Sequence, residues 1–258
     1  MKIVVLVKEV PDTYGDRKLN LETGLADRAA SEAVLDEIGE RSLEVALSYA
    51  DKNPGTEVVV LSMTPESSAA TVRKGLAMGA ASAVQIADEA LAGADTVLTA
   101  EVLAAALKRT GFDLVIAGNQ STDGSGGVVP AMVAELLAVP LVSGLNSVEL
   151  TEESVAGERA IEGGTQRVRS GLPAVISITE RLPDARFPNF KGIMAAKKKP
   201  FETLTLADLG IDPMDPAAAR SIMLSVSEKP PRAAGVKIVD EGDAGVKLAE
   251  FLAENRLV

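Results

Sequence analysis

Short apolar runs alternate with helical patterns along most of this chain. Runs rich in Val, Ile and Leu with few polar residues are typical of strands that are buried on both faces. They lie at residues 3–7, 57–62, 83–86, 113–117 and 174–178. Between them, apolar residues recur at helical spacing over residues 29–51, 67–78 and 95–109, and again from Val128 onward. This order predicts an α/β fold, in which a mostly parallel sheet carries helices on both faces.

The strand at 113–117 is followed by a loop of small residues and then by the helix that starts near Val128. Four of the loop residues are glycines: Gly118, Gly124, Gly126 and Gly127. Glycine lets the backbone adopt positive φ and approach a ligand closely, and amides entering a helix direct the positive end of its dipole outward. The loop is therefore a candidate phosphate site. Because it lacks the P-loop lysine and the GxGxxG spacing, a plain strand-to-helix turn is the alternative.

Two other strand ends are expected beside this glycine loop. Ligands of open α/β sheets bind beyond the carboxyl ends of the strands. Residues 8–11 and 63–65 follow the first two predicted strands, so we expect them to meet the glycine loop at one cleft. Their convergence favours a nucleotide site.

Composition excludes several kinds of chemistry. The 258 residues are 47% hydrophobic but 3% aromatic, which suits an aliphatic core and leaves few side chains to stack on bases. The formal net charge of −11 argues against nonspecific binding of nucleic acid. Because the chain contains no Cys and no His, disulfides, thiolate nucleophiles, zinc sites and Ser-His-Asp triads are excluded. We expect no metal site.

The N-terminal apolar run is too short for a signal peptide, and the sequence has no apolar run of about 18 residues that could span a membrane. We therefore expect a cytoplasmic protein without a membrane-inserted segment.

Residues 146–170 change the pattern to strict alternation of apolar and polar positions. Alternation is typical of half-buried antiparallel strands, here at 147–150, 154–161 and 165–169. Gly163-Gly164 is a two-residue hairpin signal between the last two. We expect an antiparallel insertion, either a structural flap or a functional one.

Residues 181–200, RLPDARFPNFKGIMAAKKKP, form a basic segment in an acidic chain. Six of its residues are Lys or Arg, against Asp184 alone, and they accompany four apolar side chains. These four are Phe187, Phe190, Ile193 and Met194. A solvated face is one interpretation, but charge together with apolar anchors favours docking to an acidic partner.

The C-terminal residues 229–258 resemble an arm. Lys229-Pro230-Pro231 predicts a stiff spacer, and residues 245–255 predict a helix with Leu248, Phe251 and Leu252 on one face. This apolar stripe covers either the chain's own domain, residues 1–228, or a different subunit.

Seven motifs follow one another along the chain: VLVKEVPD at 5–12, VRKGLAMGA at 72–80, DLVIAGNQSTDG at 113–124, EGG at 162–164, LPAV at 172–175, KGIMAAKKKP at 191–200 and PPRAAGVKIV at 230–239. In order and spacing they resemble those of the β subunit of electron-transfer flavoprotein, and the resemblance covers nearly the full length of the chain.

The resemblance implies an adenine-nucleotide α-hydrolase-like, Rossmann-type fold with a buried AMP, in a heterodimer whose α subunit carries most of the FAD site. Loop amides would surround the phosphate, while Leu6 and Met63 would contact the adenosine. The AMP site of the family maps onto Leu6, Asp36, Glu37, Ile38, Gly39, Met63, Gly118, Asn119, Gln120, Ser121, Thr122, Asp123, Gly124, Ser125, Gly126, Gly127, Val128 and Val129.

The resemblance also gives the basic segment and the arm a role. The segment would be the recognition loop that docks acyl-CoA dehydrogenases and similar flavin dehydrogenases, with Phe190 in place of a leucine anchor, and the arm would embrace the α subunit. Electrons would pass from fatty acid β-oxidation to a quinone oxidoreductase, through a carrier that is not an enzyme. The partner-recognition residues would be Arg186, Phe187, Phe190, Ile193, Met194, Lys197, Lys198 and Lys199.

This sequence departs from the family pattern at two places. Asp36-Glu37-Ile38 stands where many relatives have Asn-Pro-aromatic, so an aromatic contact to the flavin is missing. Ala160 replaces a glutamate that helps to hold the flavin domain in relatives.

Three other functions are alternatives. A flavin-bifurcating complex would place a second FAD in the AMP cleft, which the sequence does not exclude. The basic segment and the arm argue against a stand-alone ATP-binding module. An adenylating enzyme would need a Lys or Arg in the glycine loop, and none lies between Gly118 and Pro130.

Overall fold

The computed structural model describes residues 1–216, 218, 220–235 and 237–258. The chain divides into two units, Met1–Leu224 and Ser225–Val258. Each unit is described by itself.

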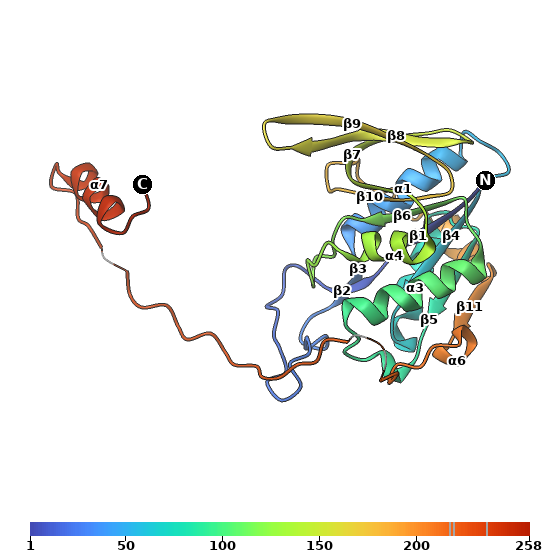
Figure 1. The fold of residues 1–258 in the computed structure, drawn as a ribbon, viewed down its shortest axis with the longest axis horizontal. Helices are drawn as coiled ribbons and strands as arrows, with labels where there is room; N and C mark the ends of the chain where they lie inside the picture. Colours follow the sequence, from blue (N-terminus) through green and yellow to red (C-terminus); the bar gives the residue numbers. More distant parts are fainter. Residues whose placement is uncertain (217, 219, 236) are drawn as a thin grey trace. The chain divides into compact units, whose positions relative to one another are not determined.

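A nine-stranded sheet runs through the first unit in the order β11-β5-β4-β1-β6-β10-β7-β8-β9 (Figure 1). Its strands from β11 to β7 are parallel, whereas β8 and β9 add antiparallel pairs. The predicted α/β fold with a mostly parallel sheet is confirmed. The strands are β1 (Lys2–Leu6), β4 (Glu57–Met63), β5 (Ser82–Ile86), β6 (Leu114–Gly118), β7 (Leu141–Leu150), β8 (Ser154–Ile161), β9 (Gly164–Gly171), β10 (Ala174–Ile178) and β11 (Phe201–Leu204).

Helices cover both faces of this sheet. On one face lie α1 (Glu37–Ala50) and α2 (Ala69–Met78), with α5 (Phe190–Ala196) against α2. On the other lie α3 (Thr96–Thr110), α4 (Val129–Leu137) and α6 (Leu206–Leu209). Two 3-10 turns, η1 (Glu66–Ser68) and η2 (Glu89–Leu91), precede α2 and α3.

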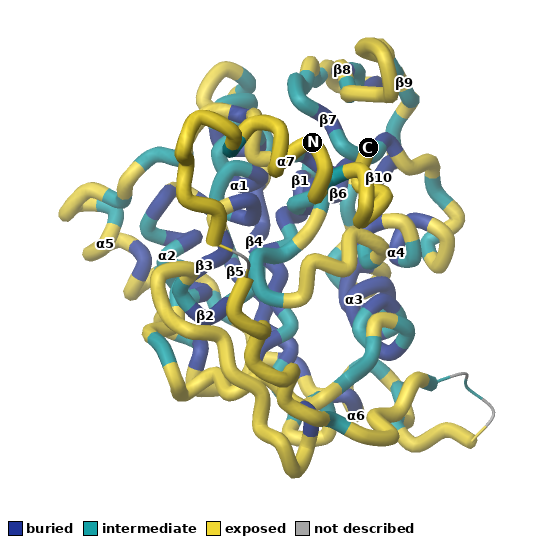
Figure 2. The backbone as a smooth tube through the Cα atoms, turned by 90° about the vertical axis from the view of Figure 1, so that its left-hand side faces the viewer, coloured by how far each residue is buried: buried dark blue, intermediate teal, exposed yellow. Residues whose placement is uncertain are grey.

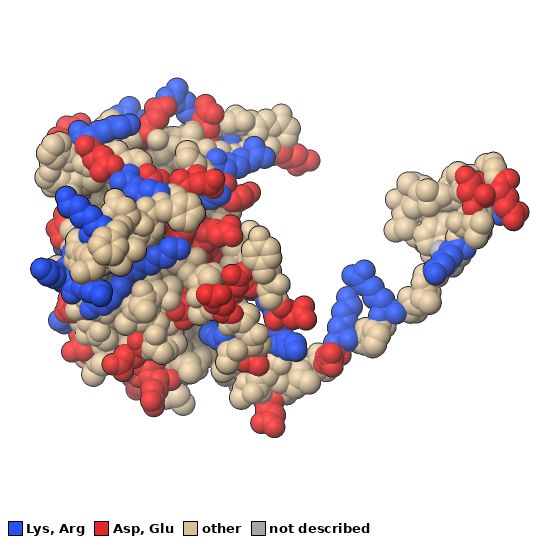
Figure 3. All heavy atoms as spheres, turned by 180° about the vertical axis from the view of Figure 1, so that it is seen from behind, with Lys and Arg blue, Asp and Glu red and all other residues tan. Residues whose placement is uncertain are grey.

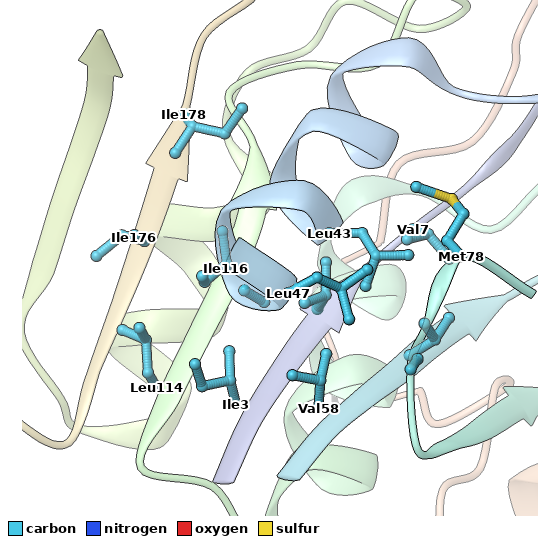
Figure 4. Packing of buried hydrophobic residues seen from close by; sticks show 14 of the residues in the cluster. Ile3, Val7, Leu43, Leu47, Val58, Met78, Leu114, Ile116, Ile176 and Ile178 are labelled. Carbon is cyan, nitrogen blue, oxygen red and sulfur yellow. The ribbon is translucent and has the colours of Figure 1, made fainter. Parts of the chain in front are cut away.

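The core has two halves because successive strand residues point to opposite faces. Ile3 and Val5 of β1 pack beneath α1, whereas Val4 packs with the α3 and α4 side, and none of the three is accessible to solvent. Figure 4 shows Leu43 and Leu47 of α1 directed at the sheet. The burial of the strands is visible in Figure 2, where the dark blue segments lie in the interior.

The predicted helix over residues 29–51 is wrong in its first part. Residues Ala33–Leu35 form β3, which pairs with β2 (Glu9–Pro11) in a small separate sheet. The side chain of Asp36 accepts hydrogen bonds from the N–H groups of Ile38 and Gly39, so α1 begins at Glu37. The other predicted helices are shifted by only one or two residues at their start: Asp95, for example, is the N-cap of α3 and lies outside the helix.

The antiparallel insertion continues the main sheet. β7 begins at Leu141, earlier than predicted, and pairs in parallel with β10 before its second half pairs with β8. The hairpin turn is Glu162–Gly163, one residue before the predicted Gly163-Gly164, because Gly164 already pairs with Ile161 and Gly163 has the positive φ of 75°.

In the described part of the second unit, residues 244–254 form the helix α7 (Ala244–Glu254), close to the predicted 245–255. None of its residues is buried, and Val246, Leu248 and Phe251 are exposed. Among the described residues, no helix has the length and apolarity needed to cross a membrane.

We predict that Leu43→Ala lowers the free energy of unfolding by about 2–5 kcal/mol, because it removes a fully buried side chain between α1 and the sheet. Leu136→Ala, at an exposed leucine of α4, is the matched control and should cost less than about 1 kcal/mol. Urea unfolding of the full chain measures both. Equal losses in the two variants would contradict this description of the core.

Candidate functional site

A cavity of about 970 Å³ lies at the carboxyl ends of the parallel strands. Leu6 of β1, Met63 of β4, Ile86 of β5 and Gly118 of β6 all contribute to its wall. This is the edge at which open α/β sheets bind ligands. The expected meeting of three strand ends at one cleft is therefore found.

Most of the residues mapped to the nucleotide site line this cavity. Those that do are Leu6, Asp36, Gly39, Met63, Gly118, Asn119, Gln120, Ser121, Gly124, Gly126, Gly127 and Val129. Those outside the lining are Glu37, Ile38, Thr122, Asp123, Ser125 and Val128. Lys8, Glu9 and Thr64 also line the cavity and belong to the strand-end segments that were expected there. Lining residues that the sequence analysis did not expect at the site include Arg28, Ile86 and Asp88.

Asp36 holds three segments of this site together. One carboxylate oxygen accepts from the N–H of Ile38, 3.0 Å away, and so caps α1. The other accepts from both the N–H and the hydroxyl of Thr122, at 2.7 and 3.0 Å. The Asp36 N–H donates to the carbonyl of Lys8. The buried carboxylate thus fixes the glycine loop against α1, and the backbone N–H of the same residue ties this point to the end of β1.

Gly118 permits a close approach behind the cavity wall. A Cβ at this position would lie 2.9 Å from the Cγ2 of Ile38, closer than real side chains come. Ile38 is buried, so it supports the loop from behind instead of contacting a ligand.

The glycine loop leaves backbone donors available. Within the described residues, the N–H groups of Gly126 and Gly127 donate to no protein group, and no side chain caps the N terminus of α4. The side-chain oxygen of Asn119 is buried without a partner there as well. Gly127 has a φ of 66°, as the loop geometry predicted for a glycine. These groups can bind a ligand that both accepts and donates hydrogen bonds.

Two cations converge on Asp123 at the cavity. The Lys8 Nζ lies 2.8 Å from one carboxylate oxygen, and the Arg28 guanidinium lies 3.0 Å from the other. Burial alone would raise the pKa of Asp123, but the hydrogen bonds from Lys8, Ser121 and Arg28 outweigh it, so the pKa lies well below its usual range. The carboxylate is therefore charged at neutral pH. The position of Lys8 directly after β1 indicated from the sequence that this residue lies at the cavity. Nothing in the sequence pattern indicated the same for Arg28.

The predicted recognition loop is partly a helix. Asn189 caps α5 through the N–H of Gly192, and a Cβ on Gly192 would clash with the carbonyl of Ala77, so this glycine lets α5 approach α2 closely. Phe187 and Phe190 are 92% and 79% exposed, and Ile193 and Met194 are also exposed. Figure 2 shows α5 at the outside of the fold.

The basic residues of this segment differ in what they contact. Arg186 binds Glu44 and Asp51 at 2.8 and 2.9 Å. Burial would raise the pKa of Glu44, but the bonds from Arg186 lower it. Lys199 donates to the carbonyls of Leu76 and Ala80, and burial lowers its pKa. Lys197 and Lys198, in contrast, are exposed. Figure 3 shows Lys and Arg gathered around uncharged side chains on one part of the rear face.

Comparison with known proteins identifies the family. Residues 23–209 match the model of the electron transfer flavoprotein domain. The chain is 44% identical to the electron transfer flavoprotein subunit beta of Mycobacterium bovis, over 99% of both chains. It is 35% identical to the caffeyl-CoA reductase-Etf complex subunit CarD of Acetobacterium woodii, over 83% of this chain and 81% of that protein. It is 32% identical to the Bacillus subtilis electron transfer flavoprotein subunit beta, over 83% of both.

The fold, the domain match and the near full-length identity agree with the resemblance found in the sequence motifs. The chain belongs to the electron transfer flavoprotein family, as a beta subunit.

Proposed function

We propose that this chain is the β subunit of a heterodimeric electron-transfer flavoprotein that binds AMP in the cavity and helps to hold an FAD carried mainly by the α subunit. It accepts electrons from acyl-CoA and similar dehydrogenases and passes them to a quinone oxidoreductase. The observation that carries the proposal is the cavity beside the glycine loop, at the carboxyl edge of the sheet.

The residues present fit AMP. The free N–H groups of Gly126 and Gly127, with the uncapped start of α4, are suited to a phosphate. Leu6 and Met63 offer apolar surface to the adenosine. The partnerless oxygen of Asn119 can accept a hydrogen bond from an amino or hydroxyl group.

A second candidate is FAD in the same cavity, within a larger complex. The cavity volume of about 970 Å³ is near the upper end of the usual ligand-pocket range, about 300–1,000 Å³, so it leaves room for more than a mononucleotide. One relative is named as a subunit of a caffeyl-CoA reductase-Etf complex, and a role of this chain in a larger complex is consistent with that name.

The chain acts as an electron carrier subunit and not as an enzyme. Bound flavin supplies the redox chemistry, and the protein supplies position and environment. The exposed apolar residues of α5 and the exposed Lys197 and Lys198 support its role in docking dehydrogenases. Arg186 and Lys199 would orient the segment from within the chain, because both are engaged by other residues. The arm is proposed to pack on the α subunit through the exposed face of α7.

The nucleotide content of the complex tests the proposal. We expect that the chain, purified with its α subunit and then denatured, releases FAD and AMP, each equimolar with the heterodimer. FAD at twice that amount without AMP would establish the second candidate. Bound ATP without flavin would contradict both.

Asp36→Ala is expected to reduce AMP content and to lower the free energy of unfolding by about 1–3 kcal/mol, because the α1 cap and the glycine-loop anchor are lost together. The matched control is Asp95→Ala, since Asp95 also caps a helix and also accepts from a second segment, at Ser221. This control should lose stability but retain AMP. Nucleotide analysis and urea unfolding measure both effects, and equal AMP content in the two variants would refute the anchor role.

Phe190→Ala is expected to slow reduction of the complex by its acyl-CoA dehydrogenase by about tenfold, as for an interface hot spot, while FAD content stays unchanged. Tyr14→Ala removes a different exposed aromatic side chain and serves as the control. Stopped-flow reduction of the bound flavin gives the rates. If Phe190→Ala reacts at the rate of the unaltered complex, α5 is not the docking element.

A further inference from the structure

Most residues in the wall of the nucleotide cavity are uncharged, but its charged residues are mainly acidic. Five carboxylates line it, at Glu9, Asp36, Glu66, Asp88 and Glu89. The only cations in the lining, among the described residues, are Lys8 and Arg28. A phosphate entering the cavity is therefore attracted by Lys8 and Arg28 and repelled by the carboxylates that lack a cation beside them.

The two cations are held together by a carboxylate just outside the lining. Asp123 accepts from Lys8 at 2.8 Å and from Arg28 at 3.0 Å. Its side chain is only 8% exposed, while those of Lys8 and Arg28 are 40% and 47% exposed and can present their remaining N–H groups to a ligand. Two positive charges against one negative charge leave this cluster with a net charge of +1.

The cluster belongs to the same loop that offers free backbone amides. Asp123 is followed directly by Gly124, whose N–H donates to the Asp123 carboxylate at 2.6 Å, and then by Gly126 and Gly127. Lys8 comes from the end of β1, and Arg28 from the segment that also places Leu25 and Ala26 in the cavity wall. Three separate segments thus bring their polar groups to one end of the site.

We propose that Lys8 and Arg28 bind the phosphate of the nucleotide, and that Asp123 limits the charge of the phosphate that the site accepts. The proposal rests on the nucleotide site described under the proposed function and identifies its selectivity. A phosphate monoester carries about −1.5 to −2 charges near neutral pH, and each further phosphate adds negative charge. A cluster of net charge +1, in a cavity whose lining also contains Glu66, Asp88 and Glu89, favours the monophosphate over the triphosphate.

The experiment uses the heterodimer of the full chain with its α subunit, unfolded to release nucleotide and refolded with FAD and added nucleotides. Titration with AMP gives the concentration for half-saturation. In the variant carrying both Lys8→Ala and Arg28→Ala, this concentration should rise about ten- to a hundredfold, as expected when hydrogen bonds between charged groups are lost. Lys74→Ala removes an ion pair with Glu40 outside the cavity, so it is the matched control and should leave the value unchanged.

Asp123→Asn tests the charge limit. Refolding in an equimolar mixture of AMP and ATP should give AMP almost exclusively with the unaltered chain. The variant should shift the incorporated ratio toward ATP by about tenfold, because the cluster then carries two uncompensated positive charges. A further measurement lets adenosine compete with AMP for the unaltered heterodimer. The affinity for adenosine should be at least tenfold lower than that for AMP, since adenosine lacks the phosphate.

Each outcome decides one question. AMP affinity unchanged in the double variant, or adenosine as tight as AMP, would overturn the role of Lys8 and Arg28. An unaltered AMP to ATP ratio in Asp123→Asn would overturn the charge limit. Neither of these results would refute the proposed function, provided that the unaltered heterodimer binds AMP. The proposed function itself would be refuted if the unaltered heterodimer bound no adenine nucleotide. FAD content and thermal unfolding show whether each variant has folded. The adenosine competition uses the unaltered heterodimer, so its result does not depend on the folding of any variant.

Discussion

The carboxylate of Asp36 is the interaction on which the site depends. It is buried, and its two oxygens accept from two different elements, the first turn of α1 and Thr122 of the glycine loop. A buried carboxylate is costly unless its oxygens are hydrogen-bonded, so the loop and the helix must keep the positions that satisfy it. The backbone bond from Asp36 to Lys8 then ties the end of β1 to the same point. The spacing of the cavity wall follows from this one residue.

The sheet was predictable from the sequence because the buried parallel strands are continuous apolar runs, and that signal does not depend on other parts of the chain. The runs containing Val4, Val59 and Val115 all lie in adjacent strands with the expected direction. The helix at 29–51 was mispredicted because Ala33 and Val34 fit a helical pattern, while the pairing of β3 with β2 depends on residues far away in sequence. The short strand β11 was missed for the same reason, since its partner β5 lies more than a hundred residues earlier.

The lining of the candidate site was predicted in part. The loop glycines and the strand ends carry local signals, and most of those residues line the cavity. Arg28 lies in an irregular segment, and its role depends on a contact with Asp123, 95 positions away, which no local pattern encodes. The basic segment shows a related limit, because charge counted along the sequence does not distinguish the exposed Lys198 from Lys199, which donates to carbonyls of the α2 region.

The position of β9 at one end of the sheet has a consequence for how the chain behaves at high concentration. A terminal strand has a row of backbone N–H and C=O groups with no neighbouring strand, and such edges promote pairing between molecules and aggregation. Arg167 and Arg169 lie on this strand, and Arg167 forms an ion pair with Glu149. Charged side chains along the edge make stacking of identical strands unfavourable, since like charges would then lie directly opposite one another. The open edge of the sheet thus carries its own protection against self-association.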